Sequence, residues 1–144
     1  MIKHEDTKTR GQRAGRFAPI PDETERTARE VVDAAVQIHR ALGPGLLESV
    51  YETCLVHELR KRGLRVEHQV AVPVVYDGVE IASGLRPDVI VDGRVIAEVK
   101  AVEKMLSLYE AQLLTYLKLT GIRLGLLVNF NVPLAEDGIR RIVR

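Results

Sequence analysis

The chain has 144 residues, a net charge of +1, 46% hydrophobic and 28% charged residues, and a single cysteine. This length suggests one domain that can bury a sizeable core, and the small net charge argues against a uniformly basic surface. One cysteine excludes an internal disulfide and any site built from four cysteines, iron–sulfur clusters included. No apolar run reaches membrane-spanning length and the N-terminus lacks the apolar region of a signal peptide, so we expect a cytoplasmic protein without a membrane partner.

Residues 1–21 are predicted to form a disordered basic tail, and residues 22–144 a single domain. The tail has little apolar content and contains five Lys or Arg residues against two acidic ones, a composition typical of disorder. It is either an arm that binds nucleic acid or a solvated leader, and the leader is the favoured interpretation.

Two helices are predicted at the start of the domain. The first follows Pro21 with Asp22 as its N-cap and ends at Gly43, because apolar residues recur between them at helical spacing. The Gly-Pro-Gly break at 43–45 separates it from a second helix over about residues 46–62.

The next region is predicted to form strands. Residues 66–76 resemble one long strand in which Pro73 marks an edge or a bulge. The Asp-Gly pairs at 77–78 and 92–93 predict hairpin turns, so the region should form a meander. The further strands cover residues 79–81, 88–91 and 95–99.

A third helix and two more strands complete the chain. Ser107 and Glu110 form a capping box that opens the helix, and Gly121 ends it after Thr120. The strands that follow cover residues 123–130 and 138–144. With the β region counted as a three-stranded meander, the element order is α-α-β-β-β-α-β-β, which predicts a mixed α/β (α+β) protein.

The segment RPDVIVDGRVIAEVK (86–100) carries charges within apolar strands. Buried charges are costly unless they are paired or bind a metal, and Asp88, Glu98 and Lys100 lie in or beside these strands. Glu98 and Lys100 are two residues apart in one strand, so they share a face of the sheet. The three side chains are therefore candidates for a functional site.

The position of Asp88 depends on the turn between the two strands. A two-residue loop at 92–93 would pair Asp88 with Ala97 and direct it away from Glu98. A three-residue loop at 92–94, or a bulge near Pro87, would pair Asp88 with Glu98. The site hypothesis therefore predicts one of these irregular connections.

Two carboxylates beside a backbone carbonyl provide the hard oxygen ligands that Mg²⁺ or Mn²⁺ prefers. Such an ion neutralises charge on a scissile phosphate, and Lys100 could bind the attacking water or the phosphate. The alternative is an ordinary Glu98–Lys100 ion pair on a solvated face, which the spacing alone favours.

Further polar residues have both structural and functional interpretations. Glu48 is either a first-turn carboxylate favoured by the helix dipole or a third acid beside the metal. Gln112 and Tyr116 share a helix face, where they either pack or bind a nucleic-acid backbone. Arg86 and Lys104 flank the site and either contact phosphates or balance its acids.

The remaining reactive side chains are predicted to be structural. Cys54 lies on an apolar stripe and is expected to be a small buried hydrophobe. His39 lies near the end of the first helix, where capping or packing explains it. His57 and His68 have no partner at metal-ligand spacing and are expected on the surface.

Three motifs resemble the PD-(D/E)XK nuclease superfamily. Pro87-Asp88 followed by EVK (98–100) is similar to its signature, and QLLTY (112–116) resembles the QxxxY motif of its RecB-like members. GLLESVY (45–51) matches the GxxExxY motif of a small bacterial and archaeal family in that superfamily. The resemblance extends from about residue 23 to the C-terminus.

This resemblance implies a restriction-endonuclease-like core of order α-β-β-β-α-β, here with an extra N-terminal helix and a mixed central sheet. It implies that Asp88 and Glu98 bind Mg²⁺ or Mn²⁺, with the Val99 backbone carbonyl and Glu48 as further ligands, and no iron–sulfur cluster. It makes Lys100 the catalytic lysine. The substrate-binding candidates are Gln112, Tyr116 and Arg86.

The favoured function is a Mg²⁺-dependent nuclease acting on nucleic acid, with DNA the preferred substrate. One alternative is a catalytically silent scaffold that binds nucleic acid or protein, and another is a structural subunit of a defence or repair assembly. The sequence leaves the oligomeric state open, with a homodimer as one alternative.

Overall fold

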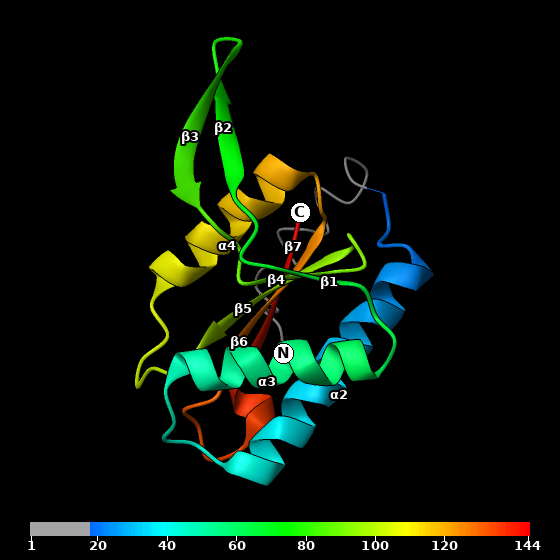
Figure 1. Cartoon of the computed structure of the whole chain (residues 1–144), viewed down its shortest axis with the longest axis vertical. Coiled ribbons are helices and arrows are strands. Elements are labelled where there is room, and N and C mark those ends of the chain that lie inside the picture. The colour runs from blue at the N-terminus through cyan, green and yellow to red at the C-terminus, as the bar shows by residue number, and fades with distance from the viewer. Residues whose placement is uncertain (1–17) are drawn as a thin grey trace.

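A five-stranded sheet lies between helices in the computed structural model, which describes residues 18–144 (Figure 1). Helices α2 (Asp22–Leu42) and α3 (Glu48–Lys61) cover one face, and α4 (Ser107–Thr120) covers the other. The sheet order is β1-β4-β5-β6-β7. Its strands are β1 (Val66–His68), β4 (Val89–Val91), β5 (Val95–Lys100), β6 (Leu124–Asn129) and β7 (Ile139–Val143).

The predicted helices are confirmed, with a correction at two N-termini. Pro21 and Leu106 occupy the N-cap positions in extended conformation, and neither helix has a side-chain cap hydrogen bond. Asp22 and Ser107, predicted as N-caps, are the first helical residues instead. Carboxylates in the first turn still stabilise each helix through its dipole.

The prediction of one long strand over residues 66–76 is wrong. Gln69 has a φ of 56°, a left-handed conformation that interrupts the strand. The chain then forms a separate two-stranded sheet from β2 (Val72–Tyr76) and β3 (Val79–Leu85). The region is therefore not a meander, because β3 pairs with β2 and not with β4.

The β2–β3 hairpin confirms two finer predictions. Asp77 and Gly78 both have positive φ, as a two-residue hairpin turn requires, and Tyr76 pairs with Val79. The register shifts between Val72 and Val74, so Pro73 marks a bulge. This hairpin projects from the body of the molecule beside α4 (Figure 1).

The main sheet is mixed. β5 and β6 are parallel and connected through α4, whereas the other neighbouring strands are antiparallel. Every residue of β6 is buried, as expected for a strand covered by helices on both faces. The sheet therefore gives β5, which carries Glu98 and Lys100, a rigid central position.

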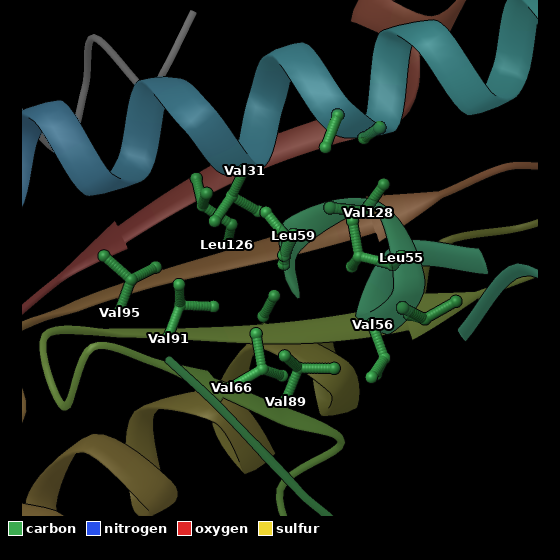
Figure 2. Packing of buried hydrophobic residues seen from close by; sticks show 14 of the residues in the cluster. Val31, Leu55, Val56, Leu59, Val66, Val89, Val91, Val95, Leu126 and Val128 are labelled. Atoms are coloured by element: carbon green, nitrogen blue, oxygen red, sulfur yellow. The ribbon is translucent and has the colours of Figure 1, made fainter. Parts of the chain in front are cut away.

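Alternation along the strands separates two apolar cores. Val95, Ala97 and Val99 of β5 pack on the α2 and α3 side, whereas Ile96 packs on the α4 side. Figure 2 shows the first core, in which Val31 of α2 and Leu55 and Leu59 of α3 lie against the sheet. Glu98 lies two residues after Ile96 in β5, so its side chain is on the same face of the sheet, the one covered by α4.

The predicted tail of residues 1–21 lies mostly outside the described residues, which begin at Ala18. Arg123 donates hydrogen bonds to the carbonyls of Ala18 and Pro19, and Ile20 packs against the first core. Among residues 18–144, no helix combines the length and the hydropathy that crossing a bilayer requires.

Gly125 allows α4 to lie close to β6, and we expect Gly125→Ala to destabilise the protein. An added Cβ would lie 2.8 Å from Leu113 Cδ1, and Leu113 is fully buried and cannot move aside freely. The free energy of unfolding, measured by urea denaturation, should fall by about 1–3 kcal/mol. Combining Gly125→Ala with Leu113→Ala should cost less than the sum of the single changes. If Gly125→Ala unfolded at the same midpoint urea concentration as wild type, the prediction would be wrong.

Candidate active site

The loop between β4 and β5 sets the register of the two strands. Asp92 and Gly93 both have positive φ, and the Arg94 N–H donates to the Val91 carbonyl. The ladder nevertheless pairs Val91 with Val95. Arg94 is therefore an extra residue in the connection, and the predicted three-residue loop is confirmed.

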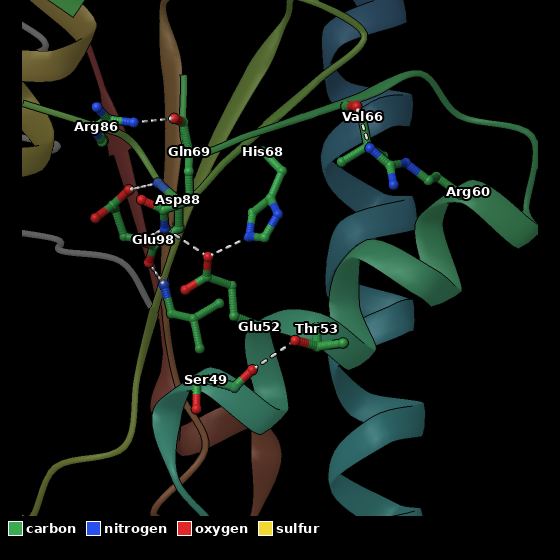
Figure 3. A network of polar contacts seen from close by, with 11 residues as sticks. Ser49, Glu52, Thr53, Arg60, Val66, His68, Gln69, Arg86, Asp88 and Glu98 are labelled. Atoms are coloured by element: carbon green, nitrogen blue, oxygen red, sulfur yellow. Dashed lines mark hydrogen bonds and ion pairs between the residues drawn. The ribbon is translucent and has the colours of Figure 1, made fainter. Parts of the chain in front are cut away.

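This register places Asp88 opposite Glu98, because Val89 pairs with Ala97 one position along the ladder. The Asp88 backbone N–H donates to Glu98 Oε2 at 2.6 Å. The Val99 backbone N–H donates to Asp88 Oδ2 at 2.8 Å. Each carboxylate is thus held by the backbone of the other strand, and the two lie together at the end of the sheet (Figure 3).

Burial makes ionisation of both carboxyl groups unfavourable. It raises the pKa of Asp88 to about 6, against the lowering effect of the Val99 hydrogen bond. Burial, followed by the charge of Asp88, raises the pKa of Glu98 to about 8. Without a cation, the two carboxyl groups therefore resist carrying a negative charge each, and a bound cation would favour their ionised forms.

Lys100 ends β5 on the same face as Glu98. Its Nζ lies 4.5 Å from the centre of the Tyr109 ring, a cation–π contact that directs the ammonium. Its positive charge also lowers the pKa of both Asp88 and Glu98, so it acts on the carboxylate pair.

Helix α4 contributes Tyr116 and Gln112. Tyr116 is buried, and burial, followed by the charges of Glu98 and Asp88, raises its pKa. Gln112 lies one turn earlier on α4 and is half-buried.

Comparison with family models identifies the chain. Residues 25–142 match the PD-(D/E)XK nuclease superfamily model. The chain belongs to the PD-(D/E)XK nuclease superfamily. No curated protein and no solved structure matches it significantly. The mixed sheet with its flanking helices is the restriction-endonuclease-like fold that the sequence predicted.

In this PD-(D/E)XK domain, Tyr51 shapes the start of α3. Its ring stacks on Phe130 with centroids 4.4 Å apart, and its hydroxyl donates to the Gly43 carbonyl. The same hydroxyl accepts a hydrogen bond from the Leu46 N–H. Tyr51 thus fixes the loop that leads into Glu48, the first residue of α3, whose charge raises the pKa of Asp88.

Two polar residues beside the carboxylates, Glu52 and Gln69, were not singled out from the sequence. Glu52 of α3 accepts a hydrogen bond from Gln69 Nε2 and pairs with His68 Nε2, each at 2.6 Å. The predicted surface position of His68 is confirmed, since its side chain is 39% exposed, although it pairs with Glu52. Glu52 lies one turn after Glu48, so helical spacing could have revealed it.

Two further residues fix the surroundings of the pair. Arg86 donates from its guanidinium to the Gln69 carbonyl at 3.4 Å. Asn129 is buried, and its side chain accepts from the Val102 N–H and donates to the Val102 carbonyl. Asn129 therefore anchors the segment that leaves β5 immediately after Lys100.

The donor set of the PD-(D/E)XK site fits a divalent cation. Asp88 and Glu98 bring carboxylate oxygens together where burial disfavours their charge, and Mg²⁺ and Mn²⁺ prefer such hard oxygen ligands. Within residues 18–144, no group of three or more His, Cys, Asp or Glu side chains is spaced to hold a metal. The structure does hold two carboxylates together, those of Asp88 and Glu98.

The raised pKa of Glu98 predicts how stability depends on pH without metal. Unfolded carboxyl groups ionise near pH 4, so between about pH 4 and about 8 the folded protein binds more protons than the unfolded chain. The free energy of unfolding should therefore fall as pH rises through this window.

Glu98→Gln should remove much of this fall, because a carboxamide oxygen still accepts from the Asp88 N–H but does not titrate. In EDTA, the free energy of unfolding should fall between about pH 5 and about pH 8.5 by at least about 1.4 kcal/mol more in wild type than in Glu98→Gln. This is the free energy that corresponds to a difference of one pKa unit between folded and unfolded states. Urea unfolding at each pH measures the difference. Glu67→Gln, an exposed position on β1, should keep the wild-type profile. Superimposable profiles for wild type and Glu98→Gln would refute the prediction.

Proposed function

We propose that this protein is a divalent-metal-dependent nuclease that hydrolyses phosphodiester bonds of nucleic acid, with DNA the favoured substrate. The metal is Mg²⁺ or Mn²⁺. The GxxExxY motif at 45–51 further supports membership of the GxxExxY family within the superfamily. A chain with a single cysteine, unable to form an internal disulfide, suits a reducing cytoplasm.

The observation that carries the proposal is the carboxylate pair formed by the half-buried Asp88 and the buried Glu98. The two carboxyl groups have raised pKa values. Glu98 accepts from the Asp88 backbone N–H and Asp88 accepts from the Val99 backbone N–H, and the charge of Lys100 acts on both. Pairs of titratable groups perturbed in this way concentrate at functional sites. A solvated Glu98–Lys100 ion pair does not explain them, because Glu98 is 4% exposed.

Each residue then has a role in hydrolysis. Asp88 and Glu98 bind the cation, with the Val99 carbonyl as a further ligand. The cation, when bound, lowers the pKa of water and neutralises charge on the scissile phosphate. Lys100 donates a hydrogen bond to the attacking water or to a phosphate oxygen, and its charge stabilises the negative charge that develops there.

The residues around the pair bind the substrate. Tyr116 and Gln112 present a hydroxyl and a carboxamide from α4, groups that hydrogen-bond phosphate or sugar oxygens. Arg86 supplies a cation for a neighbouring phosphate. Glu48, at the start of α3, acts as an additional acid on the metal side of the site.

Purified protein should cleave nucleic acid in the presence of Mg²⁺ or Mn²⁺ and not in EDTA. A panel of linear, circular and single-stranded DNA and of RNA identifies the substrate, with linear and circular DNA expected to be cut. Asp88→Ala should abolish cleavage, because it removes a metal ligand. Asp33→Ala, an exposed position on α2, should leave cleavage unchanged. If calorimetry detects no Mn²⁺ binding and no substrate is cut, the nuclease proposal is wrong.

Lys100→Ala should lower kcat by about 10²–10³-fold, the usual cost of losing one preorganised donor to developing charge. The affinity for Mn²⁺ should change little, because Lys100 is not a metal ligand. Single-turnover cleavage and calorimetry measure the two quantities separately. Lys118→Ala, an exposed lysine in the last turn of α4, is the matched control. Wild-type kcat for Lys100→Ala would exclude a catalytic role for this lysine.

A further inference from the structure

Gln69 joins the end of β1 to the candidate site. Its backbone N–H donates to the Asp88 carbonyl at 3.0 Å, which extends the pairing of β1 with β4. Its φ of 56° is unfavourable for a residue with a side chain. Such conformations persist when surrounding contacts enforce them, and they cluster at functional sites.

The Gln69 carboxamide lies between two acidic side chains. Its Nε2 donates to Glu52 Oε2 at 2.6 Å and to Asp88 Oδ1 at 3.1 Å. Glu52 and Asp88 repel each other, and the charge of Glu52 raises the pKa of Asp88. A neutral amide with two donor hydrogens can satisfy both carboxylates at once.

The orientation of this amide is determined by its neighbours. Glu52 accepts hydrogen bonds, so it selects the nitrogen end of the carboxamide, and His68 Nε2 lies 2.6 Å from the same Glu52 oxygen. Arg86 donates to the backbone carbonyl of Gln69 and so restrains the main chain at this residue, not the amide. Figure 3 shows Glu52 extending from α3 into this network, with Gln69 above it.

The contact with Gln69 completes the restraint of Asp88. Oδ2 accepts from the Val99 N–H and Oδ1 accepts from Gln69 Nε2. With both oxygens bonded, the carboxylate cannot rotate freely, and each oxygen keeps a lone pair for a cation. Without Gln69, one bond would remain and the carboxylate could turn away from Glu98.

We propose that Gln69 is a positioning residue of the metal site, whose carboxamide orients the Asp88 carboxylate for the cation. This inference rests on the proposed function, because it assumes that Asp88 binds a divalent metal. Residues that hydrogen-bond metal ligands typically contribute 10–100-fold to metal affinity.

The test compares Mn²⁺ affinity by isothermal titration calorimetry in wild type, Gln69→Gly and Gln69→Met. Glycine relieves the left-handed backbone, whereas methionine keeps both the side-chain length and the unfavourable backbone; both lack the amide. Asp77→Gly is the matched control, because Asp77 has a φ of 53° in the turn of the β2–β3 hairpin, away from the network. Thermal unfolding shows that each variant is folded.

We expect Mn²⁺ affinity to fall at least about tenfold in both Gln69 variants and to stay within twofold of wild type in Asp77→Gly. A loss in only one Gln69 variant would overturn the proposal, since backbone change or side-chain bulk would then explain it. Affinities within twofold of wild type in both would also overturn it while leaving the nuclease function intact. If wild type itself binds no Mn²⁺, the proposed function fails and this inference fails with it.

Discussion

The register between β4 and β5 is the constraint on which the rest of the site depends. Because the loop contains the extra residue Arg94, Val89 pairs with Ala97, and Asp88 therefore lies opposite Glu98. A shift by one residue would move every side chain of β4 to the opposite face. The apolar core enforces the same register, because Val89 and Val91 are fully buried on the α2 and α3 side. The packing that stabilises the sheet therefore also aligns the carboxylates.

This alignment has an electrostatic cost that the surroundings only partly offset. Burial raises the pKa of both carboxyl groups. Nearby carboxylates add to this, Glu52 and Glu48 for Asp88 and Asp88 for Glu98, whereas backbone N–H donors and Lys100 act in the opposite direction. Replacing such groups with apolar side chains would commonly stabilise a protein. Proteins keep such groups where a function requires them, at a cost in stability. A bound cation would make the electrostatic contribution of the carboxylate pair to stability favourable. The proposed cation would thus offset the cost that the chain's own groups leave.

The sequence predicted those features that local patterns determine. Apolar periodicity and the glycines at 43 and 121 placed the helix ends, and the Asp-Gly pair at 77–78 placed one hairpin. The Asp-Gly pair at 92–93 was compatible with two registers of β4 against β5, because the register depends on strand packing as well as on the turn. The separation of β2 and β3 from the main sheet was not predictable, since glutamine has no preference for the left-handed conformation that Gln69 adopts. Charges within apolar strands made Asp88, Glu98 and Lys100 candidates, whereas Gln69 reaches Asp88 only through tertiary contacts.

The break at Gln69 also explains how a projecting hairpin coexists with a precise site. The chain leaves the sheet after Gln69 and returns at Asp88, and a backbone hydrogen bond of 3.0 Å joins these two residues. The Gln69 amide adds a second link through Asp88 Oδ1. These two hydrogen bonds close the base of the segment formed by residues 70–87. The strands β4 and β5, buried between the helices, hold Asp88 opposite Glu98 independently of the hairpin.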